Sequence, residues 1–186
     1  MDKLIVTNKE LTGLVGKICR DIAVSGWRPD YVVGITRGGA VPAVMISHYF
    51  NIPCEMLKVS LRDGGQCESN CWMAEDAFGY IPEGPFREGI TKRSDPTFAK
   101  KILVVDDIND SGATINWIMQ DWQGSCLPAD PAWEHVWGNN VRFAVLYDNL
   151  ASKSSIGASY VGEEINKSDD DVWIDFPYES WWTNKN

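Results

Sequence analysis

Residues 102–114 read ILVVDDINDSGAT, and this stretch decides the fold. Its first four residues are apolar and mostly β-branched, which predicts a strand over 101–106 that is buried on both faces. Two adjacent carboxylates and a turn of small residues follow, and the next apolar pattern predicts a helix over 114–122. A buried strand that leads through a tight turn into a helix is typical of parallel sheets, whose ligands bind at the carboxyl ends of the strands.

The alternation of strands and helices continues on both sides of this stretch. The apolar pattern predicts helices over 11–22 and 40–50 and strands over 31–35, 52–59 and 142–147. This alternation indicates an α/β domain with a mostly parallel sheet and helices on both faces. A length of 186 residues favours a single domain, 1–186. Residues 62–96 break the pattern, with five glycines and three prolines, and a stretch of that kind is usually functional or mobile.

The composition excludes several classes of partner. The chain has 17 Lys and Arg against 26 Asp and Glu, a net charge of −9, which argues against nucleic acid and anionic membranes. No apolar run is long enough to span a bilayer, and no secretory signal opens the sequence, so we expect a cytoplasmic protein. The odd count of five cysteines favours free thiols. Cys67 and Cys71 could form half of a zinc site, but the only histidines, His48 and His135, are not spaced as the other half.

The turn after the 101–106 strand has the properties of a phosphate site. Gly112 and Ala113 allow a phosphate to approach the main chain, Ser111 and Thr114 offer hydroxyl donors, and the following helix contributes its positive end. Paired carboxylates beside such a turn suit a ligand that also carries vicinal hydroxyls and Mg²⁺. The alternative is an acidic turn that only caps the helix.

This stretch resembles the signature of the type I phosphoribosyltransferases, in which a hydrophobic strand, two acids and an Asp-Ser/Thr-Gly-x-Thr loop bind phosphoribosyl pyrophosphate. The resemblance implies that Asp106 and Asp107 hold the ribose hydroxyls, with Asp107 beside Mg²⁺, and that Asp110 lies near the base and the anomeric carbon. It also implies that the 5′-phosphate is bound by Ser111, Gly112, Ala113 and Thr114.

Residues 34–42, GITRGGAVP, resemble the pyrophosphate loop of the same family. Arg37 is a planar donor suited to a diphosphate, and Gly38 and Gly39 permit close approach of the backbone. In a generic loop an Arg-Gly-Gly sequence is more often only a turn, but here it follows a predicted core strand and precedes a helix. The resemblance predicts a non-proline cis peptide near Thr36–Arg37.

Residues 171–178, DVWIDFPY, resemble the purine-binding segment of bacterial xanthine–guanine phosphoribosyltransferases. The resemblance implies that Trp173 stacks on the base and that backbone groups of Ile174 and Asp175 read its edge, within a base-binding flap over 160–182. The alternative is a C-terminal aromatic cluster that closes the core.

One position departs from the family. Many 6-oxopurine enzymes carry a lysine directly after the strand predicted here over 142–147, but this chain reads Asp148-Asn149-Leu150. Lys153 could reach the purine from a longer loop, or Asn149 could replace the lysine as a neutral donor; a solvated Lys153 is the third possibility.

The resemblance implies a three-layer fold with a five-stranded flavodoxin-like sheet, a hood insert over 62–98 with Arg62 and Lys92 as its candidate cations, and the C-terminal flap. It implies an Mg²⁺-dependent enzyme that converts a 6-oxopurine (guanine, xanthine or hypoxanthine) and phosphoribosyl pyrophosphate to nucleoside 5′-monophosphate and pyrophosphate, with Asp110 and Arg37 as catalytic residues. A homodimer or homotetramer is typical of the family, and the insert could instead form an oligomer contact. The alternatives are transfer to a pyrimidine or another base, or a non-catalytic regulator that binds phosphoribosyl pyrophosphate.

Overall fold

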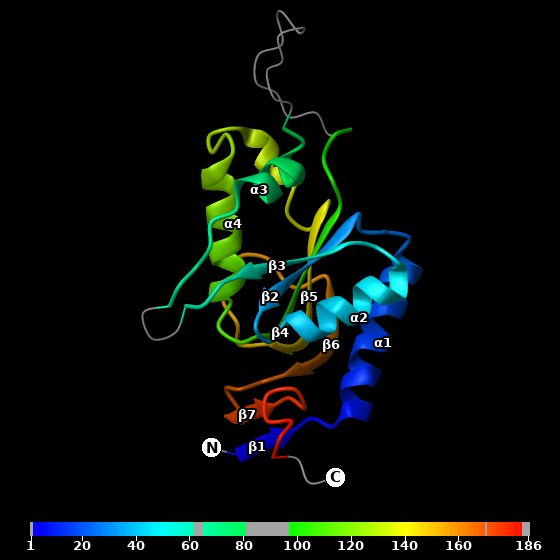
Figure 1. Cartoon of the computed structure of the whole chain (residues 1–186). Helices are drawn as coiled ribbons and strands as arrows, with labels where there is room; N and C mark the ends of the chain where they lie inside the picture. Colours follow the sequence, from blue (N-terminus) through cyan, green and yellow to red (C-terminus); the bar gives the residue numbers. More distant parts are fainter. Residues whose placement is uncertain (1, 62–64, 81–96, 170, 184–186) are drawn as a thin grey trace, which may run out of the picture.

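The computed structural model describes residues 2–61, 65–80, 97–169 and 171–183 (Figure 1). Its main sheet has five parallel strands in the order β3–β2–β4–β5–β6. These strands are β2 (Tyr31–Thr36), β3 (Cys54–Lys58), β4 (Ile102–Asn109), β5 (Val141–Asn149) and β6 (Tyr160–Ile165). The order is that of a flavodoxin-like sheet, which confirms the predicted fold class. In these ranges the structure contains no helix that meets the length and hydropathy needed to cross a membrane.

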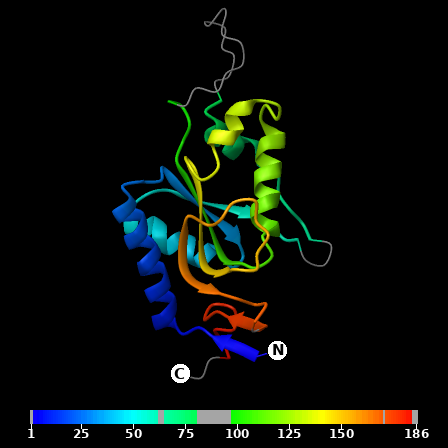
Figure 2. The same cartoon turned by 180° about the vertical axis from the view of Figure 1, so that it is seen from behind.

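Helices cover both faces of this sheet (Figures 1 and 2). One face carries α1 (Asn8–Ser25) and α2 (Ala40–Phe50), and the other carries α3 (Cys71–Phe78), α4 (Ala113–Ser125) and the 3₁₀ helix η1 (Pro131–His135). The central strand β4 feeds both cores, since Leu103 and Val105 pack with α1 and α2 while Ile102 and Val104 pack on the opposite side. All four are at most 1% exposed, as the apolar run of the sequence predicts.

The ends of α1 follow from local sequence chemistry. Thr7 and Glu10 form a reciprocal capping box at its start, and Gly26, with φ of 71°, ends it in the left-handed conformation. Between these caps the buried residues recur with helical spacing, so α1 presents one apolar face to the sheet; they are Leu11, Val15, Ile18, Cys19 and Ile22.

The absence of regular structure expected over 62–96 is wrong in one place. Helix α3 lies within this range, begins where the Asn70 side chain accepts a hydrogen bond from Met73 N at 3.0 Å, and buries Met73 and Phe78 in the core. With only eight residues it is too short to show a clear period between glycine-rich flanks. The two candidate cations of the insert, Arg62 and Lys92, lie outside the described residues.

Of the C-terminal segment 160–182, β6 joins the main sheet and the residues after it do not. Strand β7 (Val172–Asp175) pairs in parallel with β1 (Asp2–Ile5), with Lys3 opposite Trp173, and Val6 N donates to Asp175 O at 2.9 Å. The flap is defined as β1, β7 and residues 176–183, in place of the range 160–182 that was expected from the sequence. In Figure 1 the flap lies below the main sheet, so the two ends of the chain meet there.

Candidate active site

A cavity of about 390 Å³ opens at the carboxyl edge of the main sheet. Because the strands are parallel, the residues that follow β2, β4 and β6 all reach this edge. The cavity is lined by the loops after β2 and β4, by residues 59–61 after β3, by part of β5 and by Lys167 after β6. Four flap residues complete the lining: Trp173, Ile174, Phe176 and Glu179. Its volume is in the range of sites for small-molecule ligands.

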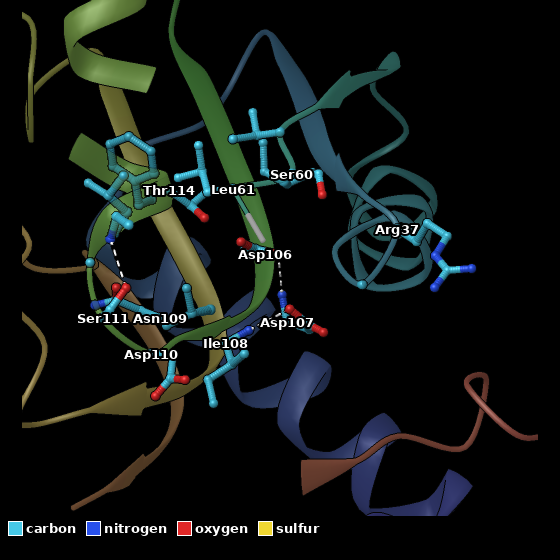
Figure 3. Close-up of a pocket in the computed structure, with 18 of the residues that line it drawn as sticks. Arg37, Ser60, Leu61, Asp106, Asp107, Ile108, Asn109, Asp110, Ser111 and Thr114 are labelled. Atoms are coloured by element: carbon cyan, nitrogen blue, oxygen red, sulfur yellow. Dashed lines mark hydrogen bonds between the residues drawn. The ribbon is translucent and has the colours of Figure 1, made fainter. Parts of the chain in front are cut away.

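Asp106 and Asp107 occupy the last part of β4 and both line the cavity (Figure 3). Asp107 N donates to Asp106 Oδ1 at 2.9 Å, and Ile108 N donates to Asp107 Oδ1 at 2.8 Å. Burial raises the pKa of the Asp106 carboxyl, and the neighbouring charge of Asp107 raises it further. Asp106 and Asp107 therefore place two acidic groups side by side at the cavity, and hydroxyl donors or a cation would stabilise them.

The turn from Asp110 to Thr114 lines the cavity with all five of its residues, as predicted. Gly112 has φ of +86°, and a Cβ at this position would overlap the backbone of Ser154, so only glycine fits. Lys153 N donates to Ser111 O at 3.0 Å, which braces the turn from the segment after β5. Helix α4 begins at Ala113 and directs its positive end to this part of the cavity.

The loop after β2 brings Arg37 and Gly38 to the cavity. The predicted cis peptide is present between Thr36 and Arg37. A Cβ at Gly38 would overlap the Asp107 carboxylate, so glycine allows this loop to pack directly on the acids. Gly39 is buried behind the loop and is not among the lining residues. In Figure 3 the guanidinium of Arg37 points away from Asp110, so the two groups serve different parts of the cavity.

Among the described residues, the lysine that lines this cavity is Lys167, which sequence reasoning missed. Its Nζ lies 3.2 Å from Asp110 Oδ1, and its side chain is only 17% exposed. The side chain of Lys153 is exposed and is not among the lining residues, so the structure does not bring it to the cavity. Lys167 follows β6 by two residues. Recognition of 160–165 as a parallel strand would have placed it at the carboxyl edge of the sheet.

Asn149, at the end of β5, connects Asp110 and Lys167. Its Nδ2 donates to Asp110 O at 3.0 Å and to Asp110 Oδ1 at 3.3 Å, while its Oδ1 accepts from Lys167 N at 3.1 Å. The residue is 6% exposed. The side-chain amide of Asn149, which the sequence suggested as a neutral donor to the base, is therefore directed to Asp110. It holds both Asp110 and Lys167, the two partners of the ion pair.

The flap residues separate into two groups. Trp173 and Ile174 line the cavity, whereas Asp175 does not: its carbonyl accepts from Val6 N, and its Oδ2 lies 4.0 Å from Lys3 Nζ. Phe176 is 2% exposed and belongs to the core, as the aromatic-cluster alternative expected of this segment. Trp173 is 41% exposed, so it does not pack in that way.

The described residues contain no group of three or more His, Cys, Asp or Glu side chains that could hold a metal ion. A cation bound at Asp106 and Asp107 would therefore need oxygen atoms from a ligand or from water. This donor set fits Mg²⁺, which is commonly bound by one or two carboxylates together with substrate phosphates and water.

The chain is similar in sequence and in fold to known proteins. The model of the phosphoribosyl transferase domain family matches residues 5–181. Xanthine phosphoribosyltransferase 1 of Saccharomyces cerevisiae is 22% identical over 129 residues, which are 64% of this chain and 60% of that protein, so the match spans less than two thirds of the curated relative.

Two solved structures share the fold. A purine phosphoribosyltransferase from Pyrococcus horikoshii has a TM-score of 0.60 and 20% identity, with both chains covered in full. The xanthine-guanine-hypoxanthine phosphoribosyltransferase of Helicobacter pylori has a TM-score of 0.61 and 16% identity, covering 97% of this chain and 95% of its own.

Proposed function

The chain belongs to the phosphoribosyl transferase domain family, and from this premise we propose that it transfers a phosphoribosyl group from phosphoribosyl pyrophosphate to a 6-oxopurine. The products are a nucleoside 5′-monophosphate and pyrophosphate. One observation carries the proposal: the Asp110–Thr114 turn and the Trp173 flap segment line the same cavity, so a phosphate site and an aromatic base site lie within reach of one nucleotide. The names of the yeast, Pyrococcus and Helicobacter proteins support a purine as the base.

The phosphoribosyl half of the ligand is assigned to β4 and its turn. The backbone and hydroxyls of Ser111, Gly112, Ala113 and Thr114 bind the 5′-phosphate at the start of α4. Asp106 and Asp107 accept hydrogen bonds from the ribose hydroxyls. The guanidinium of Arg37 binds the diphosphate beside the backbone of Gly38, and Gly39, whose amide donates to Ile35 O at 2.8 Å, holds the loop from behind.

Mg²⁺ fits beside this half of the ligand, held by Asp107 with oxygen atoms of phosphoribosyl pyrophosphate. When bound it neutralises charge on the departing diphosphate. The protein contributes the second cation, Arg37, and we expect removal of Mg²⁺ with a chelator to abolish activity.

The base half is assigned to Asp110, Lys167 and the flap. Trp173 stacks on the purine, the backbone of Ile174 reads its edge, and Lys167 Nζ donates to its 6-oxo group. Asp175 was expected to share the reading of the edge, but it does not line the cavity and its carbonyl accepts from Val6 N, so we give it no base contact. The sequence left this role open between Lys153 and Asn149. We assign it to Lys167 because Lys167 lines the cavity, whereas Lys153 does not and the Asn149 side chain is hydrogen-bonded to Asp110.

The reaction replaces one bond at the anomeric carbon by another. The bond from that carbon to the diphosphate oxygen breaks, the bond to the base nitrogen forms, and the proton of that nitrogen passes to the carboxylate of Asp110. Lys167, whose Nζ lies 3.2 Å from Asp110 Oδ1, holds this carboxylate in place until the base arrives. The diphosphate leaves with its charge compensated by Arg37.

A spectrophotometric screen of free bases with phosphoribosyl pyrophosphate and Mg²⁺ tests the proposal. We expect turnover of guanine, xanthine or hypoxanthine. Turnover of orotate or uracil alone would identify a pyrimidine enzyme, and binding of phosphoribosyl pyrophosphate without turnover of any base would identify a regulator. We also propose that the protein is a homodimer or homotetramer in the cytoplasm. Light scattering of the purified protein tests the oligomeric state.

A further inference from the structure

A hydrogen bond joins the flap to the loop that carries Arg37. Tyr178 Oη donates to Gly38 O at 2.9 Å, across 140 residues of sequence. The Tyr178 ring stacks on Phe176 with 5.4 Å between centroids and 4° between planes, and Phe176 in turn packs on Tyr147 of β5 at 6.0 Å. The hydroxyl is thus held in position by a column of aromatic rings that rests on the main sheet.

The peptide group that receives this bond is held from both ends. Its carbonyl, from Gly38, accepts from Tyr178, and its amide, from Gly39, donates to Ile35 O at 2.8 Å. The Asp107 carboxylate packs against the Cα of Gly38, since a Cβ there would overlap it. The orientation of this one peptide therefore depends on the flap, on β2 and on the acidic pair together.

The Tyr178 hydroxyl remains a donor under ordinary conditions. Burial raises its pKa far above the usual tyrosine range, and the nearby carboxylates of Asp107, Glu179 and Asp106 raise it further. The phenol is consequently neutral at physiological pH, and the bond to Gly38 does not depend on pH there.

We propose that Tyr178 is a positioning residue that couples the two halves of the site, so that a diphosphate at the Arg37 loop and a base under the flap strengthen each other's binding. A ligand that fixes the Gly38–Gly39 peptide fixes the acceptor of Tyr178 and so reduces the freedom of the flap. A base that fixes the flap also fixes the hydroxyl that donates to Gly38, and so favours the loop conformation that binds the diphosphate. Each ligand strengthens the binding of the other by the same factor, because such coupling is reciprocal. This inference rests on the proposed function, which places the two ligands at these sites.

Calorimetric titration of guanine, with and without saturating magnesium pyrophosphate, measures the coupling without turnover, because neither ligand carries the ribose. We expect pyrophosphate to tighten guanine binding to the wild-type protein by about 3- to 10-fold, the equivalent of one neutral hydrogen bond. In Tyr178→Phe, which retains the ring stack, this ratio falls to within about 2-fold of one.

Tyr160→Phe is the matched control. It also removes a buried hydroxyl, which accepts from Arg142 at 2.8 Å and does not line the cavity, and it should retain the wild-type ratio. An unchanged ratio in Tyr178→Phe, equal loss in both variants, or no coupling in the wild type would overturn the inference while leaving the proposed function intact. Failure of the wild type to bind pyrophosphate and any of guanine, xanthine and hypoxanthine would overturn the proposed function together with the inference.

Discussion

The Asp110–Thr114 turn and the flap face each other across one cavity, but the chain builds them in different ways. The turn is continuous in sequence, follows the central strand of the sheet and takes its shape from its own residues, with Lys153 N bracing it at Ser111 O. The flap joins β1 from one end of the chain to β7 from the other, and the lysine beside it comes from a third segment. One region is thus fixed by local geometry, and the other exists only after distant segments have met.

This difference has a functional meaning. In the proposed reaction the turn is assigned to the contacts that any phosphoribosyl ligand needs, and these require backbone groups in a fixed arrangement. The flap and Lys167 are assigned to the contacts that distinguish one base from another, through side chains such as Trp173. We therefore expect variants of the turn to alter use of phosphoribosyl pyrophosphate and variants of the flap side to alter use of the base. Variants of Asp110, and of Arg37 at the departing diphosphate, should alter the chemical step.

The largest effect is expected from Asp110→Asn. The amide cannot accept the proton of the base nitrogen, so kcat should fall by about 10²- to 10⁴-fold, as for loss of a general base. Calorimetry should find the affinity for phosphoribosyl pyrophosphate within about 3-fold of wild type, because the phosphate contacts are made by the rest of the turn. An affinity that falls as far as kcat would instead assign Asp110 to ligand binding.

The second effect is expected from Gly112→Ala. Left-handed geometry costs a residue with a Cβ about 1–2 kcal/mol, and the overlap with the Ser154 backbone forces the turn itself to move. We expect the KM for phosphoribosyl pyrophosphate to rise by about 100-fold, since a shift of about 1 Å in a positioned ligand costs this much. The KM for the base should remain within about 3-fold, measured by steady-state kinetics.

Gly124→Ala is the matched control for this variant. Gly124 lies in α4, and a Cβ there has nothing within 4 Å, so the substitution should raise the free energy of unfolding by about 0.5–1 kcal/mol and leave both KM values unchanged. Equal damage from both substitutions would mean that α4 as a whole, and not the geometry of the turn, controls the phosphate site.

The sequence predicted the turn well because its determinants are local. The apolar run of β4, the two acids and the left-handed glycine are consecutive, so their order in sequence is their order in space. Four strands of the main sheet were identified in the same way, from runs of apolar residues. The fifth strand, β6, was expected from the family but not located, because its residues YVGEEI include two exposed glutamates at the edge of the sheet.

The base side could not be predicted in the same detail because tertiary pairing places it. Trp173 and Ile174 were identified by resemblance, but nothing local shows that β7 pairs with β1, or that this pairing engages the carbonyl of Asp175. Because β6 was not located, nothing in the sequence placed Lys167 at the cavity, and Lys153, which is nearer to β5 in sequence, was considered instead. The position directly after β5, where many 6-oxopurine enzymes carry the lysine, is not used for one here, since Asn149 ends β5 and is hydrogen-bonded to Asp110.

The third effect distinguishes these two lysines. Lys167→Met removes the ammonium from the cavity but retains most of the side-chain volume. We expect the KM for 6-oxopurines to rise by about 10- to 100-fold, the usual range for a lost hydrogen bond to a charged group, with little change in the KM for phosphoribosyl pyrophosphate. Lys153→Met is the control and should resemble wild type, because that side chain is exposed. The reverse pattern would return the assignment to Lys153.

The smallest effect is expected from Trp173→Ala. Stacking of a base on an aromatic side chain is worth about 1–3 kcal/mol, and the 41% exposure of this ring favours the lower end, so the KM for the base should rise by about 10-fold. Trp173→Phe should restore most of the affinity, because it retains an aromatic face. Trp182→Ala, at a residue that is 68% exposed and outside the cavity, should have no effect. If Trp173→Ala raised the KM for phosphoribosyl pyrophosphate equally, the ring would support the whole site, and the division between a rigid phosphate side and a selective base side would not hold.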